Sequence, residues 1–76
     1  MKIQILGTGC PKCEKTAKVV REVVEELGLD AEIEKVTDLN EIMAFNVMMT
    51  PAVAIDGQVK IAGRVPSARA LKKLLD

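Results

Sequence analysis

The 76-residue chain contains no histidine, tryptophan or tyrosine, a single phenylalanine and only two cysteines. Without histidine, the chain cannot form Ser-His-Asp or Cys-His nucleophile pairs, nor its own histidine-containing zinc site. The scarcity of aromatic side chains removes the stacking platforms that proteins use on single-stranded nucleic acid. Any chemistry must therefore come from Cys, Lys, Asp, Glu, Ser, Thr or Arg.

Net charge is also lacking, because eleven basic residues balance eleven acidic ones. A balanced chain has no basic face by composition, so we do not expect nucleic acid as a partner. The 49% of hydrophobic residues are almost all aliphatic and suffice for a core without disulfides or metal. The length and composition predict one globular domain, residues 1–76.

Long hydrophobic runs are absent too. The apolar stretch in residues 1–6 is too short for a secretory signal, and no run approaches the roughly 18 residues of a membrane span. We therefore expect a cytoplasmic monomer without a membrane partner. In that compartment two cysteines are more often thiols or redox-active groups than a permanent disulfide.

Turn signals and hydrophobic periodicity divide the chain into short elements. The predicted elements are strand 2–6, helix 11–27, strand 31–36, helix 39–45 capped by Asp38 and ended by Asn46, strands 52–55 and 58–61 joined by Asp56-Gly57, and helix 68–75 capped by Ser67. The apolar stripe of the first helix is Cys13, Ala17, Val20, Val24 and Leu27, and that of the last is Ala68, Leu71, Leu74 and Leu75.

The strand compositions predict an order across the sheet. The third strand is wholly apolar, whereas the second and fourth carry charged or polar residues, which belong on edges. This favours a four-stranded sheet with the second and fourth strands outside and the first and third inside. Gln4, in the central first strand, has no explanation at the level of sequence.

Cys10 and Cys13 form a C-x-x-C pair around Pro11 and Lys12. Cys13 belongs to the predicted buried stripe, whereas Cys10 falls at the helix cap, where the helix dipole favours a thiolate. Lys12 and Lys15 would also favour the anion, or are simply solvated. We expect Cys10 to be accessible and Cys13 to be shielded.

Three readings of the pair compete. A structural disulfide would close too short a loop to stabilise much, and the cytosol would tend to reduce it. Two thiolates are half of a tetrahedral zinc site, although a linear Cu(I) site needs no more ligands. A redox pair needs an exposed low-pKa thiolate beside a shielded partner, and this reading fits best. Met48 and Met49 could be soft-metal ligands, but we expect them to fill the core.

Three motifs together resemble the thioredoxin superfamily in its minimal glutaredoxin-like form. They are Gly9-Cys10-Pro11-Lys12-Cys13 after the first strand, Met49-Thr50-Pro51-Ala52 opening the third, and Asp56-Gly57 in the hairpin. Over its whole length the chain is similar to small archaeal and bacterial redox-active-disulfide proteins. The resemblance implies an α/β fold of order β-α-β-α-β-β-α, with a four-stranded mixed sheet and helices on both faces.

The resemblance also implies a thiol-disulfide oxidoreductase with no cofactor and no metal. Cys10 would attack and Cys13 would resolve, Pro51 would be a cis-proline beside the disulfide, and Thr50 would offer its backbone to a substrate. The substrate site would further include Lys12, Met49 and Gly63. The implied partners are a disulfide-containing protein and a reductase or low-molecular-weight thiol.

Departures from the family pattern leave some questions open. Gly9 replaces the tryptophan of ordinary thioredoxins, and no acidic residue lies in an obvious central strand. Lys12 stands where glutaredoxins usually have tyrosine, and their paired glycines appear only as Ala62-Gly63. Glutathione, another low-molecular-weight thiol and a protein disulfide therefore all stay open as reaction partners.

The heavy-metal-associated domain is the principal rival, since it also places C-x-x-C at the start of a first helix. That domain normally has methionine where this chain has Thr8, and it ends on a strand rather than a helix. Both features favour the redox interpretation over a soft-metal carrier. A redox-inert adaptor on the same fold is a third alternative.

Overall fold

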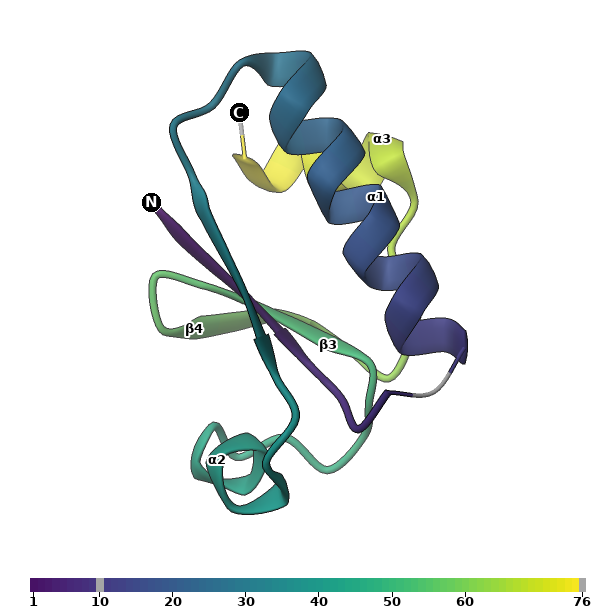
Figure 1. The fold of residues 1–76 in the computed structure, drawn as a ribbon, viewed down its shortest axis with the longest axis vertical. Helices are drawn as coiled ribbons and strands as arrows, with labels where there is room; N and C mark the ends of the chain where they lie inside the picture. The colour runs from purple at the N-terminus through teal and green to yellow at the C-terminus, as the bar shows by residue number, and fades with distance from the viewer. Residues whose placement is uncertain (10, 76) are drawn as a thin grey trace.

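The computed structural model describes residues 1–9 and 11–75. The elements are β1 (Lys2–Leu6), α1 (Pro11–Leu27), β2 (Glu32–Val36), α2 (Leu39–Ala44), β3 (Ala52–Ile55), β4 (Gln58–Ala62) and α3 (Ala68–Leu75) (Figure 1). The sheet order is β2-β1-β3-β4, with β1 parallel to β2 and antiparallel to β3, and β3 antiparallel to β4. The predicted element order, strand order and mixed sheet are all confirmed.

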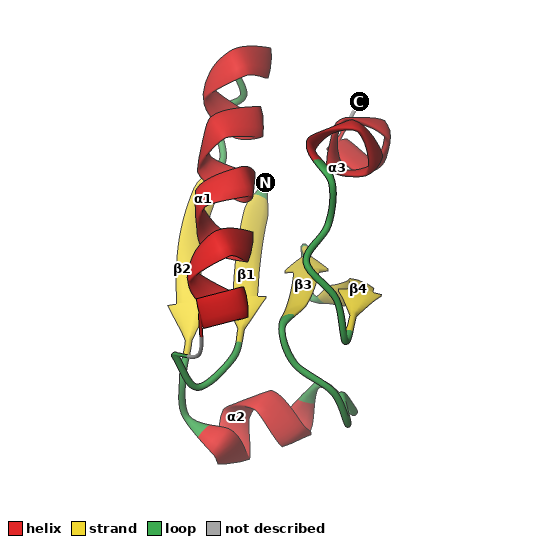
Figure 2. Cartoon of the chain, turned by 90° about the vertical axis from the view of Figure 1, so that its right-hand side faces the viewer, coloured by secondary structure: helices red, strands yellow, loops and turns green. Residues whose placement is uncertain are grey.

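Helices cover the two faces of the sheet unequally. Helices α1 and α3 lie on one face, and the short α2 lies across the carboxyl ends of β1 and β2 (Figure 2). Ile3 and Ile5 join the larger core cluster, which includes Val20 of α1 and Leu71 of α3. Leu6 joins a smaller cluster with Ile42 of α2. Part of the second face is left without a helix, because α2 is only six residues long.

The uncovered part of that face explains Gln4. Its side-chain amide donates to Glu34 Oε1 at 3.4 Å, directly across the β1–β2 pair. Lys2 Nζ lies 3.3 Å from Glu34 Oε2. A polar residue is tolerated in this central strand because its side chain points to the open half of the sheet.

Three predicted stripe positions, all near the ends of helices, are wrong. Leu27 is 36% exposed, because α1 ends in a Schellman motif at Gly28, with φ of 64°. There the Leu29 N–H donates to the Val24 carbonyl, and Leu29 packs on the core in place of Leu27. In α3, Leu71 and Leu75 are buried as predicted, whereas Ala68 is exposed and Leu74 is 42% exposed.

The predicted caps and turns are confirmed. The Asp38 carboxylate accepts from the N–H groups of Asn40 and Glu41, and Ser67 Oγ accepts from the Ala70 N–H at 3.1 Å. Asn46, with φ of 61°, follows α2 in the left-handed conformation. Asp56 and Gly57 both have positive φ in the two-residue β3–β4 turn, as a type I′ hairpin requires.

A register shift in the β3–β4 pair turns the end of β4 toward the helices. Val53 pairs with Ile61 and Ala54 with Val59, so Lys60 is the additional residue on β4. Ile61 packs in the larger cluster and Val59 against the smaller one. A regular strand would put both on one face, and the irregularity therefore lets β4 contribute to both clusters.

Candidate active site

Cys13 lies in the first turn of α1 with its side chain turned toward the sheet. It is 6% exposed, as the helical stripe predicts. The nearby connection from β1 passes so close that a Cβ on Gly7 would overlap Cys13 Sγ. Gly7 is itself held by a 3.0 Å hydrogen bond from its N–H to the Val36 carbonyl. Gly7 is thus a site residue, although in the sequence it merely follows the predicted strand 2–6.

The second cysteine, Cys10, lies outside the described residues. In the sequence it directly precedes Pro11, the first residue of α1. The predicted shielding of Cys13 is therefore observed, and the predicted accessibility of Cys10 stays a prediction.

The segment before β3 reaches the same end of the molecule. The Thr50–Pro51 peptide bond is cis and Pro51 is buried, as the resemblance implies. A Cβ on Gly7 would come within 4.0 Å of Thr50 Cβ, so the Thr50 side chain lies near Gly7 and Cys13. The β1–α1 connection and the segment before β3 thus meet beside the Cys13 thiol.

A third segment joins them from β4. The Gly63 N–H donates to the Pro51 carbonyl at 2.9 Å. A Cβ on Gly63 would lie 3.1 to 3.3 Å from the Cβ, Cε and Sδ atoms of Met49, so the methionine side chain covers the Gly63 backbone. Met49, Thr50, Pro51 and Gly63, which the resemblance places together, are therefore neighbours in the structure.

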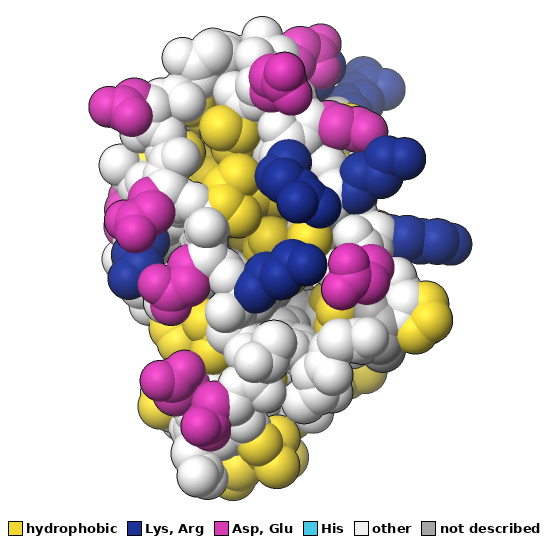
Figure 3. All heavy atoms as spheres, in the orientation of Figure 1, with side chains coloured by type: hydrophobic (Ala, Val, Ile, Leu, Met, Phe, Trp, Pro, Cys, Tyr) yellow, Lys and Arg dark blue, Asp and Glu magenta, His cyan; other side chains and the backbone are white. Residues whose placement is uncertain are grey.

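The prediction that Met48 and Met49 fill the core is wrong. Met48 is 96% exposed and Met49 63% exposed, because the preceding Val47 already fills the small cluster under α2 and the chain then turns outward. Leu39 and Met43 of α2 are 61% and 60% exposed. We call these four residues the α2 apolar surface. Hydrophobic side chains gather at this lower end of the molecule (Figure 3).

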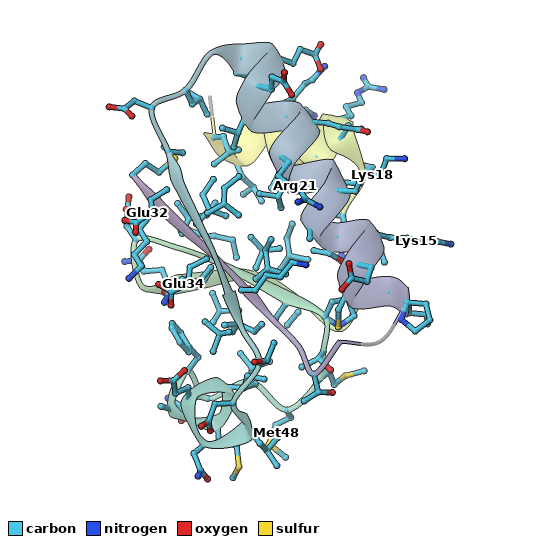
Figure 4. The ribbon with its side chains drawn as sticks, viewed as in Figure 1. Lys15, Lys18, Arg21, Glu32, Glu34 and Met48 are labelled. Carbon is cyan, nitrogen blue, oxygen red and sulfur yellow. The ribbon has the colours of Figure 1, made fainter. Side chains whose placement is uncertain are left out.

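The lysines at the start of α1 are solvated. Lys12 and Lys15 are exposed, and among the described residues neither forms an ion pair. Lys15 and Lys18 point away from the sheet, and Glu32 and Glu34 lie across the molecule along β2 (Figure 4). The Lys12 carbonyl accepts from the hydroxyl of the fully buried Thr16 at 2.8 Å, which satisfies the buried hydroxyl.

The described residues were also compared with the requirements of a metal site and of a membrane-spanning helix, and they meet neither. Nowhere in residues 1–9 and 11–75 do three or more His, Cys, Asp or Glu side chains converge on one point. In the same part of the chain, every helix is too short or too polar to cross a membrane.

A shielded cysteine of a C-x-x-C pair in the first helical turn, next to a cis-proline that opens an antiparallel strand, defines a thioredoxin-like protein. Comparison with known proteins gives the same class. Residues 1–76 match the model of a thioredoxin domain family. The chain belongs to this family, and it is a thiol-disulfide oxidoreductase of the thioredoxin type.

Two relatives from methanogenic archaea are similar over nearly the whole chain. A protein named thioredoxin from Methanothermobacter thermautotrophicus is 48% identical over 99% of this chain and 97% of its own length. A thioredoxin from Methanocaldococcus jannaschii is 52% identical over 96% of this chain and 84% of its own length. These similarities give no support to the soft-metal alternative.

Proposed function

We propose that the C-P-K-C pair carries the reaction, with Cys10 attacking and Cys13 resolving. The Cys10 thiolate attacks one sulfur of a substrate disulfide, forms a mixed disulfide and releases the first substrate thiolate. Cys13 then loses its proton and attacks Cys10 sulfur, forming the internal disulfide and releasing the second thiolate. The released thiolates take up protons, so the substrate gains two electrons and two protons from the dithiol.

The burial of Cys13 is the observation that carries this assignment. At 6% exposure, beneath the Gly7 backbone, Cys13 is poorly placed to meet a large substrate first. Attack by Cys13 on a sulfur already bound to Cys10 requires no access from solvent. Because Cys13 is the shielded thiol, we assign it the second, resolving step and assign the first attack to Cys10.

The start of α1 supports the reactivity of Cys10. In the sequence this residue adjoins the helix N-terminus, whose unpaired N–H groups and partial positive charge stabilise an anion. Lys12 in the first turn and Lys15 directly after it add positive charge near the helix start, where Glu14 adds one negative charge. These groups favour the thiolate without a histidine.

The neighbouring segments are suited to hold a substrate strand. Thr50 is exposed, and among the described residues its backbone N–H and carbonyl groups have no hydrogen-bonding partner. An extended substrate can pair with these groups, while Met49 and Gly63 flank the strand and Lys12 lies on the helix side. The proposed substrate site thus contains Lys12, Met49, Thr50, Pro51 and Gly63.

The α2 apolar surface favours a protein as the substrate. Three of its four exposed side chains are methionines. Leu39 and Met43 lie on α2, and Met48 and Met49 lie on the loop that leads to Pro51. Flexible methionines adapt to partners of different shape. We propose that a cytoplasmic monomer reduces protein disulfides and is itself reduced by a reductase or a low-molecular-weight thiol.

Matched serine variants test the assignment. With a protein disulfide as substrate, Cys13→Ser should accumulate a mixed disulfide through Cys10, visible by intact mass, because the resolving thiol is gone. Cys10→Ser should lose turnover while keeping the wild-type thermal unfolding midpoint. Full turnover in Cys10→Ser, or a mixed disulfide trapped at Cys13, would show that the assignment is wrong.

A further inference from the structure

A pocket of about 270 Å³ lies between β4 and α3. Its lining includes Lys60 and Ile61 of β4, Arg64, Val65 and Pro66 of the connection, and Leu74 of α3. We call it the β4–α3 pocket. One water takes up about 30 Å³ of liquid, so the pocket is much larger than a water site. It is smaller than the roughly 300 to 1,000 Å³ of pockets that enclose a whole small-molecule ligand. Its size therefore suits a large side chain of a partner.

The floor of the β4–α3 pocket is apolar. Ile61 is 4% exposed and Pro66 is buried. Leu74 is 42% exposed, although helical spacing places it on the apolar stripe of α3. An apolar side chain that entered the pocket would remove Leu74 from water, and this burial favours binding. Leu74 thus offers contact area to a ligand rather than to the core.

Two cations line the same pocket. Lys60 and Arg64 are exposed, and among the described residues neither forms an ion pair. No described residue of the lining is acidic. Residues 58–76 contain five basic residues against one acidic residue, whereas residues 1–57 contain six basic and ten acidic residues. The neutral composition therefore hides a basic region, whose positive charge favours an acidic ligand.

The pocket adjoins the proposed substrate site. Arg64 directly follows Gly63, whose N–H donates to the Pro51 carbonyl. The β4–α3 connection therefore takes part in both sites. Helix α3 also lies on the same side of the molecule as β3 and β4 (Figure 2). A protein bound at Thr50 can thus reach the β4–α3 pocket with a neighbouring segment of its chain.

We propose that the β4–α3 pocket binds an acidic segment of a partner protein, with an apolar side chain of that segment against Leu74 and its carboxylates beside Lys60 and Arg64. The inference rests on the proposed function only in taking the partner to be a protein, since neither cysteine takes part in this contact. Single-stranded nucleic acid is disfavoured, because the described lining offers no aromatic ring for base stacking.

Cysteine-free peptides test the pocket separately from the redox reaction. The probe is a fluorescein-labelled peptide in which a leucine is flanked on each side by a pair of glutamates. In one control peptide serine replaces the leucine, and in another glutamines replace the glutamates. By fluorescence polarisation at low salt, we expect the probe to bind about tenfold more tightly than either control, and its affinity to fall as salt is added.

Variants of the chain locate the binding site. Lys60→Gln and Arg64→Gln should each weaken binding of the probe about twofold to fivefold, because each removes one exposed charge contact. Leu74→Ser should abolish the preference for the leucine peptide over the serine peptide, because the apolar contact is lost. Lys18→Gln is the matched control, since Lys18 is exposed on α1 and points away from the sheet (Figure 4). It should leave the affinity unchanged.

A peptide disulfide connects the pocket with reduction. When the acidic segment is placed beside the disulfide, KM should be lower than for the glutamine version of the same peptide, with kcat unchanged. Arg64→Gln should remove this difference in KM. Unfolding midpoints measured for each variant identify any loss of structure.

Three outcomes would overturn the inference. They are equal binding of the probe and either control peptide, an unchanged leucine preference in Leu74→Ser, and equal weakening in Lys18→Gln and Arg64→Gln. A single-stranded oligodeoxythymidine that bound as tightly as the probe would also overturn it, because the site would then be a general polyanion surface. Full turnover in Cys10→Ser would instead refute the proposed function and would leave the peptide-binding result unaffected.

Discussion

Gly63 is the residue at which backbone conformation and the proposed substrate site are most directly linked. Its φ of 77° disfavours any side chain, and the space above it is occupied by Met49. Gly57 has a similar φ of 85°, but a Cβ there would meet nothing within 4 Å. Comparing a substitution at Gly63 with the same substitution at Gly57 therefore distinguishes the effect of backbone strain from the effect of displacing Met49.

We predict that Gly63→Ala and Gly57→Ala each destabilise the protein by about 1 kcal/mol, from the positive φ alone. Only Gly63→Ala should also raise KM for a protein disulfide, because Met49 has to move. Urea unfolding and steady-state kinetics measure the two effects. Equal KM values for the two variants would contradict a role for the Gly63–Met49 contact in binding.

Single residues also show where reasoning from sequence stops. The inward position of Cys13 follows from helical spacing, because its neighbours four and seven residues along are apolar. The contact between Gly7 and Cys13 Sγ joins two segments through space, and no local pattern encodes it. The exposure of Met48 was mispredicted because hydrophobicity alone does not tell how soon a small core is full.

At the scale of elements, the uncovered sheet face carries a carboxyl group with a lowered pKa. Hydrogen bonds from Lys2 and Gln4, with the positive charge of Lys2, hold the pKa of Glu34 below its usual value. Such a carboxylate contributes stability above its unfolded-state pKa, and that contribution disappears as the pH falls through the lowered folded-state pKa. Because the Glu34 side chain is 43% exposed, the contribution is small and is screened by salt.

We predict that Lys2→Met lowers the urea midpoint at neutral pH and low salt, and that this difference from wild type vanishes in acid, where Glu34 is protonated in both proteins. Lys60→Met is the control, since Lys60 is exposed on β4 and, in the described part of the chain, has no ion pair. A Lys2→Met deficit that persists at low pH would show that Lys2 acts by packing instead.

The elements themselves were largely predictable. Local signals decide each of them: Asp38 and Ser67 cap helices, Asn46 and Gly28 end them, and Asp56-Gly57 makes the hairpin. The errors lie at helix ends, where Leu27 and Leu74 continue the apolar spacing but extend past the partner that would cover them. The spacing of apolar residues shows which face of a helix is apolar, but a residue on that face is buried only where another element packs against it.

At the scale of the whole molecule, α3 completes the larger core. Leu71 is 0% exposed and belongs to the cluster with α1 and the sheet, whereas Leu74, one turn later on the same helix, is 42% exposed. Lys72 and Glu26 add a 2.7 Å contact between α3 and α1. Through Leu71 and Leu75, α3 therefore closes the larger core cluster on the side of α1.

We predict that Leu71→Ala destabilises the protein by about 2 to 5 kcal/mol, a large part of the 5 to 15 kcal/mol typical of small domains. Leu74→Ala should cost less than about 1 kcal/mol. Chemical denaturation of the two variants measures the difference. Similar losses in both would mean that α3 packs through the wider stripe expected from spacing alone.

The order of elements, the order of strands and the inward position of Cys13 can all be predicted from the amino-acid sequence, because each depends on interactions within a few residues or on whether a strand is apolar or charged. The surroundings of that thiol are known only from the folded chain: Gly7 lies against its sulfur, Gly63 holds Pro51, and the Glu14–Lys35 pair lies at a small pocket beside it. These contacts join residues from separate segments, and their geometry is set by how α1 packs on the sheet rather than by any local preference.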